Sequence, residues 1–185
     1  MKAKRTPTDT AILEAAFEVF STNPGASLGD VAERAGVGRA TLHRHYKSRK
    51  TLMVALRKQA LAELDDAVEK ATAGALSYAD GLRLALGAIV PLAERQLFLA
   101  NEPDEQDPEI AAAYRASQEE LVAAIEQARA EGAFAAEIPA SWIATAFDML
   151  IYAAWTQVRD GEATHRQAAD LAWRTLTRGL AGDAT

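Results

Sequence analysis

Residues 27–46 read SLGDVAERAGVGRATLHRHY, and their small and apolar positions fall where two short helices crossing at a tight turn need them. Ser27 and Asp30 have the spacing of a helix-capping pair, and an apolar stripe follows at helical intervals. Gly36 can end this first helix at positive φ, because glycine carries no Cβ that would clash there. Leu42 then fills the angle between the two helices. The pattern predicts a helix-turn-helix.

The second helix of this pair, expected at residues 39–46, has the composition of a DNA-reading element. Apart from Leu42 its side chains are mostly polar or basic, and more cations follow directly. A short cationic helix suits the major groove, where side chains reach base edges. We expect four residues to face base edges, namely Arg39, Thr41, Arg44 and His45. We expect three more to hold phosphates, namely Lys47, Arg49 and Lys50. The full set expected to contact DNA is Ser27, Arg39, Ala40, Thr41, His43, Arg44, His45, Tyr46, Lys47, Arg49 and Lys50.

A solvated basic face on an ordinary helical hairpin would also explain such a run of charges. The coincidence of turn, apolar stripe and charges favours DNA. The net charge of the chain is −6, but its distribution is uneven: residues 1–60 carry eleven basic and five acidic side chains, and the remainder carries nine basic and 21 acidic ones. The net charge of residues 1–60 is therefore +6, and that of residues 61–185 is −12. A basic module joined to an acidic body directs its basic end toward DNA.

Residues 8–56 resemble the tetracycline-repressor (TetR) family of transcriptional regulators. A first helix in TDTAILEAAFEVFSTNPG leads into SLGDVAERAGVGRATLHRHYKSRKTLMVAL, and the motifs DVAERAGV and TLxRHYKSRxxL are similar to the signature of that family. The resemblance implies that the third helix is the recognition helix and that the start of the fourth touches phosphate. It also implies that the remaining helices form a ligand-binding and dimerisation domain.

Two positions depart from the family pattern. His43 stands where the family usually has a phosphate-contacting tyrosine, and Gly38 stands where a serine or threonine usually opens the recognition helix. A neutral imidazole donates one hydrogen bond and carries no charge near pH 7. We therefore expect the operator sequence to differ accordingly.

The rest of the chain is also expected to be helical, because alanine and leucine dominate and alternating β-branched runs are absent. We expect an all-α fold with an N-terminal three-helix helix-turn-helix DNA-binding domain at residues 1–50. A helical effector-binding and dimerisation domain should follow at residues 51–185, linked through a long helix at about residues 48–73. A kink is expected at Pro91, since proline lacks an amide donor, and residues 101–108 read as a polar loop.

The last two helices are expected to form a homodimer interface. Ser141 should cap the first of them, WIATAFDMLIYAAWTQVRDG, whose apolar residues occur nearly all round. A helix that is apolar on more than one face must bury more than one face, which one small domain hardly allows. The apolar stripe of the final helix is Ala169, Ala172, Trp173, Leu176 and Leu180. We expect both helices to pair with their copies in a four-helix bundle.

Aromatic residues with a few polar neighbours suggest an apolar effector pocket. The candidate set is Glu94, Arg95, Phe98, Tyr114, Trp142, Asp148, Met149, Tyr152 and Trp155. The alternative is that these side chains form only core and dimer interface, because aromatic residues at helical spacing usually just pack. Asp148 is the strongest candidate, since a carboxylate in an apolar helix must meet a cation such as Arg95, water or a ligand.

Other chemistry is weakly represented. The chain has no cysteine, which excludes disulfides, thiolate metal sites and a cysteine nucleophile. Glu162 and His165 have the spacing of a carboxylate metal motif, but a bundle site needs two such pairs. Catalytic groupings and phosphate loops are also missing from the sequence, so we expect no enzyme activity, metal or cofactor. A charged N-terminus and short apolar runs indicate neither a signal peptide nor a membrane span, and a cytoplasmic protein is expected.

We therefore expect a homodimeric repressor that binds a palindromic operator and is released by a small, largely apolar effector. Effector binding would tilt the linking helix and move the two recognition helices out of register, for which a coupling of ~1–3 kcal/mol is sufficient. The competing interpretation is a helical small-molecule-binding protein or enzyme whose basic N-terminus is incidental. A DNA-bound regulator that activates, or that has no effector, is a third.

Overall fold

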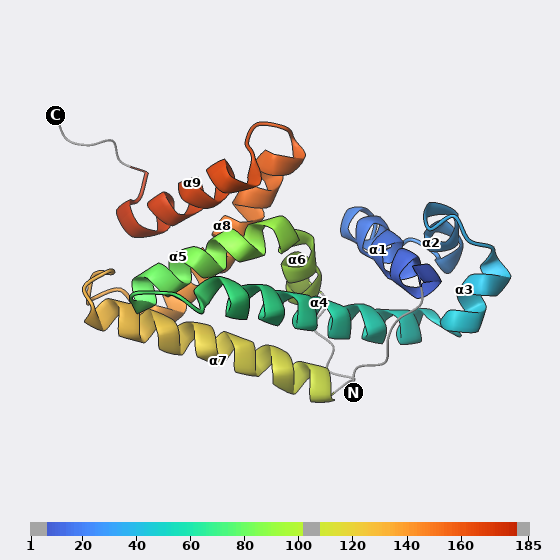
Figure 1. Cartoon of the computed structure of the whole chain (residues 1–185), viewed down its shortest axis with the longest axis horizontal. Coiled ribbons are helices and arrows are strands. Elements are labelled where there is room, and N and C mark those ends of the chain that lie inside the picture. Colours follow the sequence, from blue (N-terminus) through green and yellow to red (C-terminus); the bar gives the residue numbers. More distant parts are fainter. Residues whose placement is uncertain (1–6, 102–107, 181–185) are drawn as a thin grey trace. The chain divides into compact units, whose positions relative to one another are not determined.

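Helices make up the architecture of this chain. The computed structural model describes residues 7–101 and 108–180, in which we find helices, turns and no strand. The expected all-α class is confirmed. The elements in chain order are α1 (Pro7–Thr22), α2 (Leu28–Arg34), α3 (Arg39–His45), α4 (Arg49–Thr72), α5 (Tyr78–Ile89), the 3₁₀ turn η1 (Val90–Leu92), α6 (Ala93–Asn101), α7 (Pro108–Ala130), α8 (Ala140–Arg159) and α9 (His165–Arg178) (Figure 1).

The described residues form two compact units. The N-terminal unit comprises the described residues of Met1–Ala62 and Glu94–Ala111, and the C-terminal unit comprises those of Glu63–Ala93 and Ala112–Thr185. The N-terminal unit thus holds α1, α2, α3, the first part of α4 and most of α6. The C-terminal unit holds the rest of α4, with α5, most of α7, α8 and α9. The expected long linking helix is present as α4, which contributes to both units.

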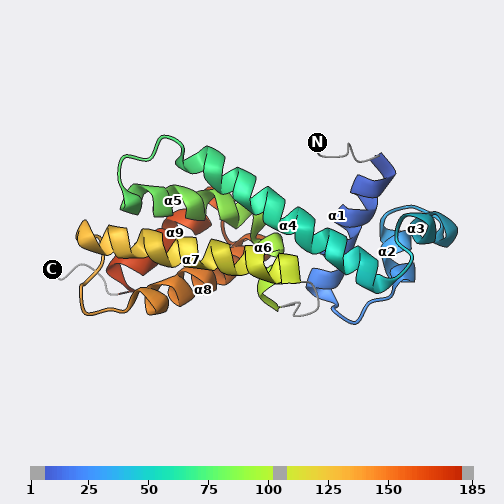
Figure 2. The same cartoon turned by 90° about the horizontal axis from the view of Figure 1, so that it is seen from below.

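The centre of the N-terminal unit is supplied by α1. Its buried side chains are Ile12, Leu13, Ala15, Ala16, Phe17 and Phe20. Burying each large apolar side chain of this kind stabilises a fold by about 1.5–3 kcal/mol. α2 packs on α1, and α3 packs on α2 (Figures 1 and 2). From α6, the ring of Phe98 meets that of Phe17 edge-on, with centroids 5.5 Å apart. The helix-turn-helix therefore packs on α1, and α1 contacts α6 through the aromatic rings of Phe17 and Phe98.

The C-terminal unit is built on a hairpin of α8 and α9, and α5 packs against both helices. Small residues on α9 permit this close packing, namely Ala168, Ala169 and Ala172. They meet larger buried side chains from α5 and α8, including Leu86, Phe147 and Ile151. A second cluster joins α7 to the start of α8 through Ile125, Phe134 and Ile143. The inner face of α8 is therefore fully occupied.

The helix ends agree with expectation except in two details. Pro91 lies in η1, which separates α5 from α6, so the expected break is confirmed. Ser141 does not cap α8, because Pro139 occupies the N-cap position in an extended conformation and the helix begins two residues earlier than expected. Leu180 does not join the stripe of α9. It is 89 % exposed, because Gly179, with φ 73°, ends the helix before it.

The polar loop expected at residues 101–108 falls mostly on residues 102–107, which lie outside the described residues. Asn101 ends α6 and Pro108 begins α7. Across the two described ranges, every helix is too short or too polar to cross a membrane.

Candidate nucleic-acid interface

A capping box starts α2. The backbone N–H and the hydroxyl of Ser27 donate to the Asp30 carboxylate at 2.7 and 2.9 Å, and the backbone N–H of Asp30 donates to the Ser27 hydroxyl at 3.2 Å. The backbone hydrogen bond from Ser27, and then its hydroxyl, hold the pKa of Asp30 below its ordinary value. At the turn after α2, Gly36 has a φ of 65°, which side chains with a Cβ rarely adopt. Both features were expected, and together they position α3.

One side chain within α3 is buried. Leu42 is 1 % exposed and is the buried residue of this seven-residue helix. The helix starts after Gly38, which offers no side-chain cap. Four of its residues are exposed, namely Arg39, Ala40, His43 and Arg44, while Thr41 and His45 are half-buried. A helix with one buried position presents most of its surface outward, as a groove-reading helix must.

Three cations on and after α3 are exposed and lack a counter-ion. Arg44, Lys47 and Lys50 form no ion pair with any residue of the described ranges. Cations of this kind are available to phosphate oxygens and base edges. Each phosphate neutralised by such a group releases condensed counterions from DNA.

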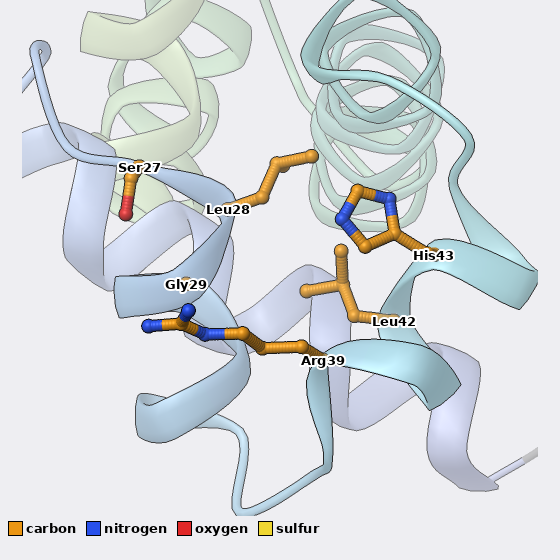
Figure 3. A pocket seen from close by; sticks show the side chains of 6 residues that line it. All are labelled: Ser27, Leu28, Gly29, Arg39, Leu42 and His43. Atoms are coloured by element: carbon orange, nitrogen blue, oxygen red, sulfur yellow. The ribbon is translucent and has the colours of Figure 1, made fainter.

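A hollow of about 300 Å³ lies between α2 and α3 (Figure 3). Its lining residues are Ser27, Leu28, Gly29, Arg39, Leu42 and His43. In Figure 3 the Arg39 side chain extends from α3 toward α2, and its guanidinium lies beside Gly29. The positive charge of Arg39 also contributes to the lowered pKa of Asp30, after the hydrogen bonds from Ser27. Arg39 therefore bends back onto α2 instead of extending freely from α3.

Tyr46 is buried, which corrects one member of the expected DNA-contacting set, and the neighbouring His45 is half-buried. Tyr46 is 7 % exposed, and its hydroxyl donates to Asp9 in the first turn of α1 at 2.5 Å. Nδ1 of His45 lies 3.7 Å from the same carboxylate oxygen, and the His45 side chain is 24 % exposed. Both residues tie the end of α3 to α1. They stabilise the position of α3 from the side that faces α1.

Arg49 also requires correction, because its side chain is committed within the protein. Its guanidinium donates to the carbonyl oxygen of Ala26 and, at 2.5 Å, to that of Pro24. It also lies over the ring of Phe20, 4.2 Å from the centroid. Arg49 thus fastens the connection between α1 and α2, whereas it was expected to hold a phosphate.

Sequence reasoning missed Asp9 and Gly29. Asp9 meets Tyr46, 37 positions along the chain, and no local pattern marks such a partner. Gly29 does carry a signal, because glycine inside a helix costs about 1 kcal/mol relative to alanine. A glycine in the first turn of α2 therefore indicates that another group approaches the backbone closely.

The expected effector-pocket residues are divided between the two units. Three belong to the N-terminal unit, namely Glu94, Arg95 and Phe98. There Arg95 pairs with Glu14 at 2.5 Å and lies over the ring of Phe17. Three others are exposed on α8, namely Trp142, Met149 and Tyr152. The half-buried Trp155 stacks with Arg159, whose Cζ is 4.6 Å from the ring centroid.

The remaining two candidates lie close together in the C-terminal unit. Tyr114 on α7 and Asp148 on α8 are both half-buried. Burial raises the pKa of the Tyr114 phenol above its ordinary value, and the negative charge of Asp148 adds to the shift. A half-buried carboxylate beside a phenol can hold a cationic or hydrogen-bonding ligand group.

Groups that suit a metal ion are not assembled in the described ranges, where no three His, Asp or Glu side chains come together. Glu162 and His165 are both exposed, the first in the turn before α9 and the second at the start of that helix. His165 is the first residue of α9, whose capping box is formed by Thr164 and Gln167.

Comparison with known proteins gives three findings. Residues 12–56 match the sequence profile of the family described as "Bacterial regulatory proteins, tetR family". The chain is 35 % identical over 179 residues to the HTH-type transcriptional repressor LfrR of Mycolicibacterium smegmatis (strain ATCC 700084 / mc(2)155), covering 95 % of this chain and 92 % of that protein.

Solved structures show the same likeness. The crystal structure of the TetR-like transcriptional regulator LfrR from Mycobacterium smegmatis in complex with proflavine matches with a TM-score of 0.72 at 32 % identity, over 95 % of this chain and 98 % of that one. The crystal structure of AibR in complex with isovaleryl coenzyme A and operator DNA matches with a TM-score of 0.73 at 19 % identity, over 91 % and 97 % of the two chains. The second likeness concerns the fold alone.

Proposed function

The chain belongs to the tetR family of bacterial regulatory proteins and is a DNA-binding transcriptional regulator, and we propose that it is a homodimeric repressor released from a palindromic operator by a small effector. In this proposal residues 1–50 form the DNA-binding domain, and residues 51–185 bind the effector and dimerise. The protein acts in the cytoplasm, where its DNA is, and catalyses no reaction.

One observation supports the proposed DNA interface above all: α3 exposes a basic face while Leu42 is buried behind it and His45 and Tyr46 tie its end to α1. Arg39 and Arg44 are proposed to read bases, since a guanidinium fork matches guanine O6 and N7. Lys47 and Lys50 are proposed to hold phosphates. The neighbouring small and polar residues complete the proposed surface, namely Ser27, Ala40, Thr41 and His43.

Selection of bound sequences from random DNA tests this proposal. A homodimer should select a palindrome whose half-sites lie about one helical turn apart, near 34–36 Å. The selected site should bind at least ~10³-fold more tightly than random DNA. Affinity should also fall steeply with salt, because each neutralised phosphate releases counterions. Binding without sequence preference or salt dependence would instead support a small-molecule-binding protein whose basic N-terminus is incidental.

The effector is proposed to be a planar aromatic cation. The relative LfrR was crystallised in complex with proflavine, a molecule of this class. In this chain the pair of Asp148 and Tyr114 offers a carboxylate and a phenol in a half-buried place. The net charge of −12 beyond residue 60 attracts cations to this part of the chain.

Titration with proflavine tests the effector assignment. Proflavine fluorescence should report binding, and added proflavine should release the selected operator fragment. Asp148→Asn should weaken proflavine binding about tenfold, which corresponds to ~1.4 kcal/mol. Asp170→Asn, at an exposed position of α9, is the matched control and should bind like the parent. If Asp148→Asn is folded by thermal melting and still binds proflavine as the parent does, Asp148 is not the cation-binding group.

A further inference from the structure

We propose that Gly29 is a specificity-determining residue, because its missing side chain leaves the space in which the Arg39 guanidinium lies across the first turn of α2. The inference rests on the proposed DNA-reading function of α3. It assigns a role in base selection to a residue of α2 that has no side chain of its own.

Distances around Gly29 carry the argument. A Cβ placed on Gly29 would lie 3.3 Å from Nη2 and 3.4 Å from Nε of Arg39, and 3.2 Å from Oγ of Ser27. Contacts this short require the neighbouring atoms to move by a few tenths of an ångström. The guanidinium therefore lies against the position that a side chain at residue 29 would begin to fill (Figure 3).

Backbone conformation does not explain why a glycine stands here. The glycines with positive φ among the described residues are Gly36, Gly132, Gly161 and Gly179. Gly29 is not among them, and it lies in the first turn of a right-handed helix, where alanine is intrinsically more favourable. The close approach of Arg39 and of the Ser27 hydroxyl is the feature of the structure that favours a residue without a Cβ here.

Arg39 and Arg44 consequently serve different positions on DNA. Arg39 is turned back toward α2, and its positive charge contributes to the lowered pKa of the Asp30 carboxylate. Arg44, five residues later, is exposed and forms no ion pair within the described ranges. Two guanidinium groups that start from opposite ends of a short helix are placed to contact different base pairs. We expect each to specify its own position of the half-site.

The test compares the sequences selected from random DNA by full-length variants. Arg39→Ala should lower base preference about tenfold or more at one half-site position, and Arg44→Ala should do so at another. Gly29→Leu should lower preference at the Arg39 position to a similar extent, and Gly29→Ala by about two- to threefold, because a single methyl displaces the guanidinium less. The Arg44 position should keep its preference in both Gly29 variants.

The methyl group added in Gly29→Ala could act in two ways: by displacing the Arg39 side chain or by clashing directly with DNA. A double-mutant cycle distinguishes these two effects. In the Arg39→Ala background, Gly29→Ala should change neither affinity nor base preference. Gly87→Ala, where an added Cβ meets no atom within 4 Å, is the matched glycine control. Gly29→Ala should melt at or above the parent temperature, because alanine favours the helix.

Two results overturn the inference while leaving the regulator function intact. One is an unchanged preference at the Arg39 position in Gly29→Leu. The other is an equal loss of affinity from Gly29→Ala with and without Arg39, which would mean that the new methyl group touches DNA itself. If the parent protein selects no sequence at all, the proposed function fails and this inference fails with it.

Discussion

Two adjacent cations show how much the role of a residue depends on what its side chain reaches. Arg49 donates to two backbone carbonyl groups in the connection between α1 and α2, whereas Lys50 is exposed and has no ion pair in the described ranges. Their charge and place in the sequence are nearly the same. The structure assigns one to the fold and leaves the other available to DNA.

Arg49→Ala should therefore destabilise the protein, because hydrogen bonds from a charged donor contribute about 1.5–3 kcal/mol. Urea unfolding should show a decrease of stability in this range. Lys50→Ala is the matched variant and should change stability by no more than about 0.5 kcal/mol. It should instead reduce the slope of log affinity against log salt by about 0.9 for each phosphate that is no longer neutralised. The structure would be contradicted if Lys50→Ala lowered the stability in urea and Arg49→Ala changed only the salt dependence of DNA binding.

Asp30 makes stability depend on pH in the acidic range. Hydrogen bonds from Ser27 lower its folded-state pKa below the ordinary value of 3.8. Its contribution to stability is therefore fully present above pH 3.8 and is lost as pH falls through the folded-state pKa. Urea midpoints of the parent and Asp30→Asn should differ at neutral pH and converge in acid. A difference that grows on acidification is incompatible with the capping box.

Residue roles at the interface could be predicted from the sequence only where the local pattern decides them. Ser27, Asp30, Gly36 and Leu42 act through neighbours a few positions away, and the structure confirms each of them. Tyr46 and Arg49 act through groups 37 and 23 to 25 positions distant. Helical spacing shows which side of a helix a residue occupies, but it does not show which distant carboxylate or carbonyl group lies on that side.

At the scale of the element, α3 is a short helix with an incomplete N-terminus. Its first backbone N–H groups receive no side-chain cap, because Gly38 occupies the N-cap position. Gly38 has φ −68° and ψ 147°, a conformation that serine adopts readily, and a Cβ there would meet no atom within 4 Å. α3 is therefore less stable than it would be with an N-cap residue whose side chain accepts a hydrogen bond.

Gly38→Ser should stabilise α3 by a few tenths of a kcal/mol, since serine accepts a hydrogen bond from the first turn. Hydrogen exchange of the Leu42 amide, which donates to the Gly38 carbonyl, should slow. Gly74→Ser, at an open position between α4 and α5, provides the control and should leave this amide unchanged. Unchanged or faster exchange in Gly38→Ser would show that the cap does not form.

Most elements could be predicted because apolar periodicity and breakers agree along the chain. α4 and the break at Pro91 follow from local preferences. The start of α8 could not be predicted to the residue, because Pro139 and Ser141 are both acceptable at a helix start. The contribution of α6 to the packing of α1 also escaped prediction, since it depends on contacts such as Phe17 with Phe98 across 81 positions.

At the scale of the whole molecule, the outer face of α8 bears on the proposed homodimer. Trp142, Met149 and Tyr152 are 69 %, 57 % and 51 % exposed, although they share a helix with the fully buried Ile151. Leu171 on the adjacent α9 is 44 % exposed. The expectation that α8 is apolar on more than one face is confirmed, and a second copy is the proposed partner of the outer face.

Trp142→Glu should shift the protein toward monomer in sedimentation velocity at micromolar concentration, because it places a charge in the proposed interface. Affinity for a palindromic site should fall with it, since each recognition helix then binds alone. Leu76→Glu, at a 94 % exposed position between α4 and α5, should leave the sedimentation coefficient unchanged. A Trp142→Glu protein that still sediments as a dimer would place the interface elsewhere.

The burial of one residue within α3 has a consequence for the evolution of such a protein. Because Leu42 alone is buried within this helix, its exposed positions can be exchanged at a cost to folding of about 0.5 kcal/mol or less each. A duplicated gene can therefore acquire a new target by a handful of point changes while its scaffold persists. Divergence among paralogues is expected to concentrate on these exposed positions and to spare the leucine beneath them.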